Sequence, residues 1–254
     1  MRRLTISRSA RELRVASLPP TPSPLHPTPW ATFDCYGTLV DWEAGIGGAI
    51  ESVALGYGGQ LLSAYYELEH VVEAERPFRP YRQVLAETLR RAAEREHLDL
   101  QPPGPAILAQ TLPDWPVFLD VGPALQALRD AGWQLAILSN VDRELIAGTL
   151  RHIPAAIDLL VTAEDVESYK PALPHFEHFR QVTGVAEGEW IHVARSWFHD
   201  IAPTHQLRVP SVWINRGSDS DDPSLAAAVL PDLRQLPETL ERLRSYASWW
   251  TAQP

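Results

Sequence analysis

The chain has 254 residues, with 45% hydrophobic and 21% charged residues, which are the proportions of an ordinary globular protein. Its formal net charge of −10 argues against a nucleic-acid partner, and no apolar run approaches the roughly 18 residues of a membrane-spanning helix. The single cysteine, Cys35, excludes an internal disulfide and a cysteine-based zinc site, so we expect a reducing, cytoplasmic compartment.

The first 29 residues differ in composition from the rest. Residues 1–15 contain five Arg and one Glu, and residues 15–29 contain six prolines. Such proline density is incompatible with a helix or a sheet, so we expect a flexible Arg/Pro-rich leader. A transit peptide is the alternative interpretation.

From Trp30 onward, short apolar runs alternate with helical patterns, which is typical of a parallel α/β sheet. The spacing predicts helices over 122–132, 142–153 and 171–184, the last with Phe176, Phe179 and Val182 on one face and Gly184 as its stop. We therefore predict a Rossmann-like core with helices on both faces of the sheet. The predicted strands are ATFDC (31–35), WQLAILS (133–139), DLLVTA (158–163), WIHVARS (190–196) and SVWIN (211–215).

One interval is too long for a simple crossover between parallel strands. Residues 43–118 separate the first strand from the helix that leads into the second, and they show apolar residues at helical spacing. We expect these residues to form an inserted α-helical cap, with residues 30–42 and 119–254 forming the core. Ligands bind at the carboxyl ends of strands in open parallel sheets, and the insertion begins at such an end.

Candidate chemical groups also follow the ends of the predicted strands. Asp34 ends the first strand, where Gly37 permits a tight turn and Thr38 adds a hydroxyl. Because parallel strands end at one edge of a sheet, the residues after the later strands should meet Asp34 there. These are Ser139, Asn140, Lys170 and Asp200.

This ordered set resembles the haloacid dehalogenase superfamily over about residues 30–220. The superfamily's four motifs are an Asp loop, a Ser/Thr loop, a Lys and an acidic loop. Its phosphatases carry a second Asp two residues after the nucleophile, where this chain has Tyr36, and a metal-binding Asp where it has Arg195. A cation in that place would repel Mg²⁺, so we predict a site without a metal or other cofactor.

The DCYGT segment resembles the type II 2-haloacid dehalogenases. That resemblance implies that Asp34 attacks the halogen-bearing carbon of a small 2-substituted carboxylate and forms an aspartyl ester, which water then hydrolyses. It assigns catalytic roles to Thr38, Lys170 and Asp200. It also implies a small-molecule substrate and allows a homodimer. Substrate contacts are expected from Cys35, Tyr36, Ser139, Asn140, Arg195 and Ser196.

The chain departs from that family where specificity is decided. Instead of the family's cap Arg, the nearest stretch offers Glu67 and Glu69, with Arg76, Arg79 or Arg82 as substitutes if the cap brings them in. Cleavage of a strained C–N bond is therefore a related possibility. Two other functions stay open. One is a Mg²⁺-dependent phosphatase that uses Asp200 as a metal ligand, and the other is a non-catalytic binding protein.

Overall fold

The computed structural model describes residues 28–250, with side chains described up to residue 245. The predicted leader lies outside these residues except for residues 28 and 29. In the described part, no helix is long and apolar enough to cross a membrane.

The core is one six-stranded parallel sheet with the strand order β3-β2-β1-β4-β5-β6. Five strands agree with the predicted runs to within two residues at either end. The sixth was missed because it is only three residues long and follows a short alanine run. The strands are β1 (Trp30–Phe33), β2 (Gln134–Ser139), β3 (Leu159–Thr162), β4 (Trp190–Ala194), β5 (Ser211–Ile214) and β6 (Ala228–Leu230).

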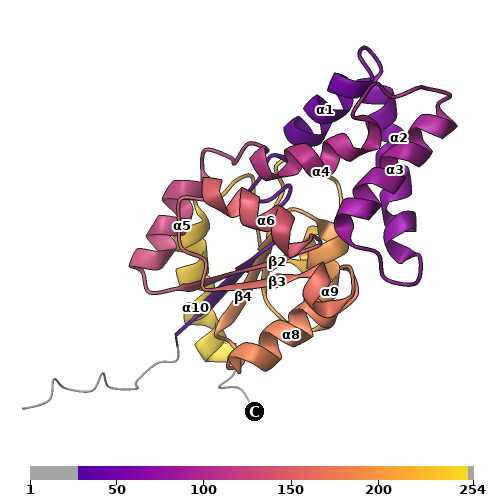
Figure 1. The fold of residues 1–254 in the computed structure, drawn as a ribbon. Helices are drawn as coiled ribbons and strands as arrows, with labels where there is room; N and C mark the ends of the chain where they lie inside the picture. Colours follow the sequence, from indigo (N-terminus) through magenta and orange to yellow (C-terminus); the bar gives the residue numbers. More distant parts are fainter. Residues whose placement is uncertain (1–27, 251–254) are drawn as a thin grey trace, which may run out of the picture.

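Alternating side chains along the strands build two apolar layers. Leu135 and Ile137 of β2 face the cluster that contains Leu125 of α5 and Leu240 of α10. Ala136 and Leu138 face the opposite cluster, with Phe176 and Phe179 of α8. Because each strand is apolar on both faces, helices cover the sheet on both sides, as predicted (Figure 1).

The core helices follow the predicted spacing with one exception. Val182 in α8 is 55% exposed, so the prediction that it shares the buried face of Phe176 and Phe179 was wrong. Gly184 ends that helix in the left-handed conformation, as predicted. The helices are α5 (Val121–Asp130), α6 (Arg143–Thr149), α7 (Ala163–Val166), α8 (Pro174–Thr183), α9 (Ala202–Gln206) and α10 (Leu236–Trp250), with the short helical turns η3 (Leu150–His152), η4 (Trp197–Ile201) and η5 (Pro223–Leu225).

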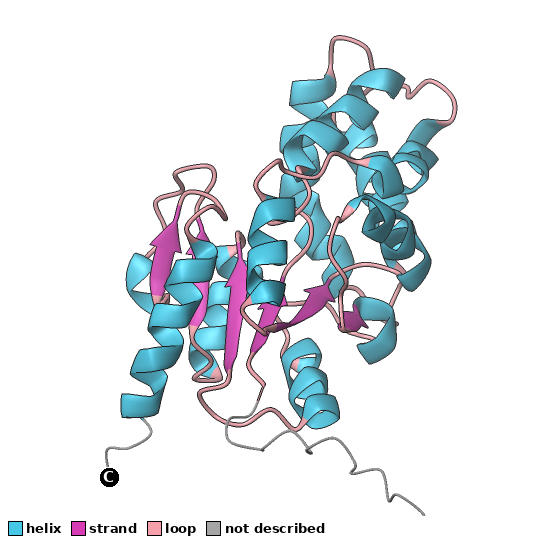
Figure 2. Ribbon diagram, turned by 90° about the vertical axis from the view of Figure 1, so that its left-hand side faces the viewer, coloured by secondary structure: helices cyan, strands magenta, loops and turns pink. Residues whose placement is uncertain are grey.

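The segment between β1 and α5 is helical and stands beyond the sheet, in the upper part of Figures 1 and 2. Its two ends are joined at the base, where the Phe118 amide donates to the Leu39 carbonyl at 3.0 Å and the Asp41 amide to the Pro116 carbonyl at 2.7 Å. We call this segment the inserted helices. They are α1 (Trp42–Val53), α2 (Gly58–Ala74), α3 (Tyr81–Arg95) and α4 (Ile107–Thr111), with the turns η1 (Gly104–Ala106) and η2 (Leu112–Asp114).

The inserted helices are attached to the sheet edge by a carboxylate. Asp142, two residues beyond Asn140, accepts hydrogen bonds from the amides of Tyr81 and Arg82 at 2.6 and 2.9 Å. These amides begin α3, whose own N-cap, Pro80, has no side chain that can accept them. A core residue therefore caps a helix of the insertion.

Candidate active site

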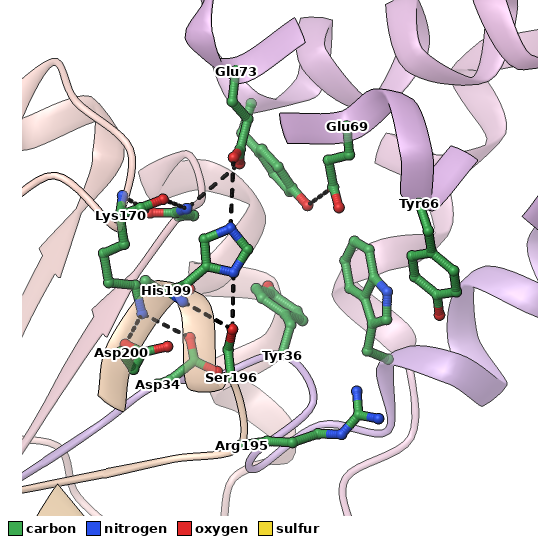
Figure 3. A pocket seen from close by; sticks show the side chains of 14 residues that line it. Asp34, Tyr36, Tyr66, Glu69, Glu73, Lys170, Arg195, Ser196, His199 and Asp200 are labelled. Carbon is green, nitrogen blue, oxygen red and sulfur yellow. Dashed lines mark hydrogen bonds and ion pairs between the residues drawn. The ribbon is translucent and has the colours of Figure 1, made fainter. Parts of the chain in front are cut away.

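A cavity of about 220 Å³ lies between the carboxyl edge of the sheet and the inserted helices (Figure 3). Most of the predicted site residues line it, and further lining residues come from the insertion. The lining residues are Asp34, Tyr36, Trp42, Tyr66, Glu69, Glu73, Tyr81, Ser139, Asn140, Lys170, Arg195, Ser196, His199 and Asp200.

Asp34 is nearly buried, with 8% of its surface exposed, and both carboxylate oxygens are held. Thr38 Oγ1 donates to Oδ2 at 2.9 Å, and Lys170 Nζ donates to Oδ1 at 2.9 Å. The contact between residues 34 and 170 on which the sequence interpretation depends is therefore present. Fixed in this way, the carboxylate has little freedom to turn away from the cavity.

The turn after Asp34 sets the direction of the Thr38 hydroxyl. Gly37 has a φ of +92°, which side chains with a Cβ rarely adopt, and the Cys35 carbonyl then accepts the amides of residues 38, 39 and 40. The Arg195 amide donates to Thr38 Oγ1 at 2.8 Å. Because that bond uses the oxygen as an acceptor, the hydroxyl proton is free to point at Asp34.

Lys170 is the one lysine among 22 Lys and Arg residues, and it is 1% exposed. Its three ammonium protons have three acceptors, namely Asp34 Oδ1, the Leu138 carbonyl at 2.9 Å and Asp200 Oδ1 at 2.6 Å. Burial lowers the pKa of Lys170, but the charges of Asp200 and Asp34 outweigh burial and raise the pKa above its usual value. The side chain therefore stays a cation between two carboxylates.

Asp200 lies in the π-helical turn η4 and is completely buried. Burial raises its pKa, but the Lys170 ammonium and a hydrogen bond with His192 act more strongly together, so the pKa falls below its usual range. Its Oδ1 takes the Lys170 contact, whereas Oδ2 is buried without a hydrogen-bond partner in the described structure. One oxygen of this cavity-lining residue therefore lacks a donor among the described residues.

A chain of buried hydrogen bonds supports Asp200 from within the sheet. Trp190 Nε1 donates to Thr32 Oγ1 at 2.8 Å, and Thr32 Oγ1 lies 2.8 Å from His192 Nδ1. Because the indole can only donate, the Thr32 proton is available to His192 Nδ1, and Nε2 carries the ring proton that reaches Asp200 Oδ1 at 3.0 Å. Sequence reasoning missed His192, since nothing in a strand pattern shows which residue of the neighbouring strand lies opposite.

Ser139 ends β2 and Asn140 follows it, but the two residues differ in what they contact. Both ends of the Asn140 amide bind the main chain of Lys170, with Oδ1 accepting at 2.7 Å and Nδ2 donating at 3.0 Å. Asn140 therefore fixes the lysine backbone. Ser139 is almost buried, and its carbonyl lies 3.2 Å from His175 Nε2.

Cys35 and Tyr36 contribute to the site in different ways. The Cys35 side chain is fully buried and does not line the cavity, and burial raises the pKa of its thiol, so only its backbone is close to the chemistry. The Tyr36 ring lines the cavity and packs edge-on against Trp42, while its hydroxyl lies 3.0 Å from Thr149 Oγ1. Trp42 also lines the cavity.

Arg195, Ser196 and His199 form another part of the wall. The Arg195 guanidinium donates to Glu43 at 2.9 Å near the cavity's end (Figure 3). Ser196 Oγ accepts the His199 amide at 3.1 Å and lies 2.9 Å from His199 Nδ1. Burial lowers the pKa of His199, so the ring is neutral near pH 7.

The inserted helices present carboxyl groups to the cavity. Glu69 and Glu73 of α2 line it, but Arg76, Arg79 and Arg82 do not. Burial raises the pKa of both glutamates, and Glu69 adds to the rise at Glu73. Sequence reasoning noticed Glu69 but missed Glu73, because an acidic residue on an amphipathic helix usually faces solvent.

Residues that match a metal site are not found in the described part of the chain. No group of three or more His, Cys, Asp or Glu side chains there has the arrangement of a metal site. Between Asp34 and Asp200 lies the Lys170 ammonium. The donor set is thus two carboxylates that already share a cation.

The fold and site together define a class of α/β protein with a charged centre at the carboxyl edge of its sheet, beneath helices inserted after the first strand. The sequence matches the model of the haloacid dehalogenase-like hydrolase family over residues 30–194. The chain belongs to this family, and it is a hydrolase.

Comparison with individual proteins gives the same family. The chain is 27% identical to the (S)-2-haloacid dehalogenase of Pseudomonas sp. (strain YL) over 192 residues, which cover 72% of this chain and 81% of that protein. The structure of the L-2-haloacid dehalogenase RSc1362 superposes with a TM-score of 0.75 at 22% identity, covering 84% of this chain and 98% of that one. The L-2-haloacid dehalogenase from Xanthobacter autotrophicus gives 0.72 at 19%, with the same coverage.

Proposed function

We propose that the chain is a metal-independent hydrolase in which Asp34 displaces a leaving group, such as a halide, from carbon 2 of a small carboxylate. The observation that carries this proposal is the nearly buried Asp34 carboxylate, held 2.9 Å from the Lys170 ammonium at the wall of a small cavity. The relatives named above are 2-haloacid dehalogenases, which supports the same type of reaction.

In the first step, an oxygen of Asp34 forms a bond to carbon 2 while the carbon–halogen bond breaks and its electron pair leaves with the halide. A halide needs no proton, so the step requires no general acid. Thr38 and Lys170 keep the carboxylate oriented and ionised until it attacks. The product of this step is an ester between Asp34 and the substrate.

In the second step, water adds to the carbonyl carbon of the Asp34 ester, and the bond between that carbon and the ester oxygen breaks. The substrate leaves as a 2-hydroxy acid, one proton is released, and Asp34 is restored. The unpartnered Oδ2 of Asp200 is suited to accept a hydrogen bond from that water. Lys170 stabilises the negative charge that develops on the ester oxygens.

Metal independence is supported by the cations already present. Lys170 lies between Asp34 and Asp200, and Arg195 lines the cavity where a phosphatase of this superfamily would have a metal carboxylate. Ser139, Ser196 and Arg195 provide donors for the substrate carboxylate, together with the backbone of residues 35 and 36. We propose that the inserted helices act as the cap that closes this space.

Halide release from a panel of 2-haloacids, measured with and without EDTA, tests the proposal. We expect equal amounts of halide and 2-hydroxy acid, with no effect of the chelator. EDTA-sensitive release of phosphate from phosphomonoesters would instead establish the Mg²⁺-dependent phosphatase. The absence of turnover with every haloacid would overturn the substrate assignment.

A further inference from the structure

The cavity wall formed by α2 carries two carboxyl groups, Glu69 and Glu73, for which residues 28–245 provide no matching cation. Glu73 is 92% buried, because only 8% of its surface is exposed. Its one side-chain hydrogen bond comes from Asn140 Nδ2 at 3.5 Å, a donor that already serves the Lys170 carbonyl at 3.0 Å. A basic group, His199 Nε2, lies 4.0 Å from Glu73 Oε2, which is too far for a hydrogen bond.

Only one carboxylate oxygen of Glu69 accepts hydrogen bonds from the described residues. Its Oε1 accepts the hydroxyls of Tyr65 at 2.9 Å and Tyr81 at 2.8 Å. Both phenols donate to the same oxygen, which leaves Oε2 for the cavity that Glu69 lines. Figure 3 shows Glu69 and Glu73 on the same side of the cavity, projecting from α2.

A buried carboxyl group without a cation is costly to ionise, and this cost is the physical cause of the raised pKa values of Glu69 and Glu73. A positively charged group in the cavity would offset it. Among the described residues no such group is in contact with either glutamate, since the Lys170 ammonium is bound to three other acceptors. A ligand that brings its own cation therefore fits this wall better than one that brings only negative charge.

The opposite end of the cavity has the reverse character. Arg195 lies there, away from Glu73, as Figure 3 shows. One guanidinium nitrogen is paired with Glu43 at 2.9 Å and lies 3.8 Å from Asp219, and the group retains further N–H donors for a carboxylate. The cavity thus has a cationic end and an acidic end, with Asp34 on its core wall.

We propose that Glu73 and Glu69 determine specificity by binding an ammonium group, so that the preferred substrate is a small zwitterion. Such a substrate carries a carboxylate, a leaving group on carbon 2 and a protonated amino group one or two bonds further on. This inference rests on the proposed function, because it takes the reaction at Asp34 as given and adds the substrate class.

Two substrates that differ only in the amino group test the proposal. The full chain is assayed with 3-amino-2-chloropropionate and with 2-chloropropionate. We expect kcat/KM to be at least ~10-fold higher for the amino compound, which corresponds to one charge-assisted contact. In Glu73→Gln the ratio of the two values should fall by ~10-fold, since the amide keeps the shape and removes the charge. A ratio at or below one in the unmodified enzyme, or an unchanged ratio in this variant, would overturn the proposal.

Glu67→Gln is the matched control, because Glu67 lies on the same helix, is exposed and pairs with Arg95 outside the cavity. It should leave both values unchanged. A binding measurement replaces the kinetic comparison if the Glu73→Gln variant fails to fold or if neither compound is turned over. In the unmodified enzyme, 3-aminopropionate should bind at least ~10-fold more tightly than propionate. Equal or weaker binding would overturn the proposal, whereas the proposed function fails separately if no ester forms on Asp34.

Discussion

The cavity has a core wall, formed by Asp34, Lys170 and Asp200 at the sheet edge, and a second wall formed by α2. These two walls differ in how completely their charges are matched. On the core wall, the Lys170 ammonium is bound by three acceptors and both oxygens of Asp34 are held. On the wall formed by α2, Glu73 has no cationic partner within the described part of the chain, and the hydrogen bonds found there for Glu69 reach one oxygen only. A wall whose charges are complete before substrate arrives is suited to chemistry, and a wall with unmatched groups is suited to recognition. We therefore locate the reaction on the sheet edge and the substrate preference on the insertion.

The largest effect should follow the loss of the nucleophile. Asp34→Asn keeps the size of the side chain but removes the charge that attacks carbon, so turnover should fall by at least ~10³-fold. Halide release measures the loss, and circular dichroism should show an unchanged fold. Asp41→Asn is the control, because Asp41 only caps α1 by accepting the Ala44 amide at 3.0 Å. Substantial activity in Asp34→Asn would show that Asp34 is not the nucleophile.

Replacing the shared cation should harm both stability and activity. Lys170→Met leaves Asp34 and Asp200 buried without their common partner, and unfolding free energy should fall by about 3–5 kcal/mol. Denaturant titration measures this change. Lys170→Arg should not restore turnover, since a planar guanidinium cannot occupy the position of a compact ammonium with three acceptors. Normal activity in the arginine variant would show that charge alone suffices.

Removing the hydrogen bonds that attach α3 to the core should have an intermediate effect. Asp142→Ala removes the acceptor for the first amides of α3, and unfolding free energy should fall by about 1–2 kcal/mol. KM should rise as well, because the insertion that completes the cavity is held less firmly. Glu144→Ala provides the comparison, since its exposed ion pair with Arg82 should contribute less than ~1 kcal/mol. Equal losses in the two variants would contradict the role of Asp142.

The smallest effect near neutral pH should come from His175, which lies under the core wall. Burial, assisted by the Lys170 charge, lowers the pKa of this imidazole to about 3. The unfolded chain therefore binds a proton below its ordinary pKa of about 6.5, while the folded chain does not until about 3. Unfolding free energy should fall with decreasing pH through this range, with up to ~1.4 kcal/mol per pH unit from this group. In His175→Gln the slope should be shallower, and an identical slope would exclude His175 as its source.

Much of the core wall was predictable, because its residues follow apolar runs that must be buried. Asp34, Ser139, Lys170 and Asp200 each lie at or after the carboxyl end of a predicted strand, and parallel strands bring these ends to one edge. The contacts behind them were not predictable. The pairing of Thr32 with His192 depends on the register between β1 and β4, which strand patterns do not define.

The wall formed by α2 was harder to predict. Glu73 differs from the exposed Glu67 of the same helix only in the direction in which the fold turns its side chain. Asn140 lines the cavity and its contact with substrate stays a prediction, but the hold of its amide on the backbone of Lys170 depends on loop geometry that the sequence does not define. The roles proposed for Cys35, Tyr36, Arg195 and Ser196, the boundaries of the cap, the cytoplasmic compartment and the homodimer stay predictions.

A single turnover in water enriched in oxygen-18, with enzyme in excess over a 2-haloacid, tests the central claim most directly. If Asp34 forms the ester and water attacks its carbonyl carbon, one oxygen-18 atom should enter the peptide that contains residue 34, and the first 2-hydroxy acid should be unlabelled. Mass spectrometry of the peptide and of the product reads both quantities. A labelled product with an unlabelled Asp34 would mean that water attacks the substrate carbon directly, in contradiction to this account.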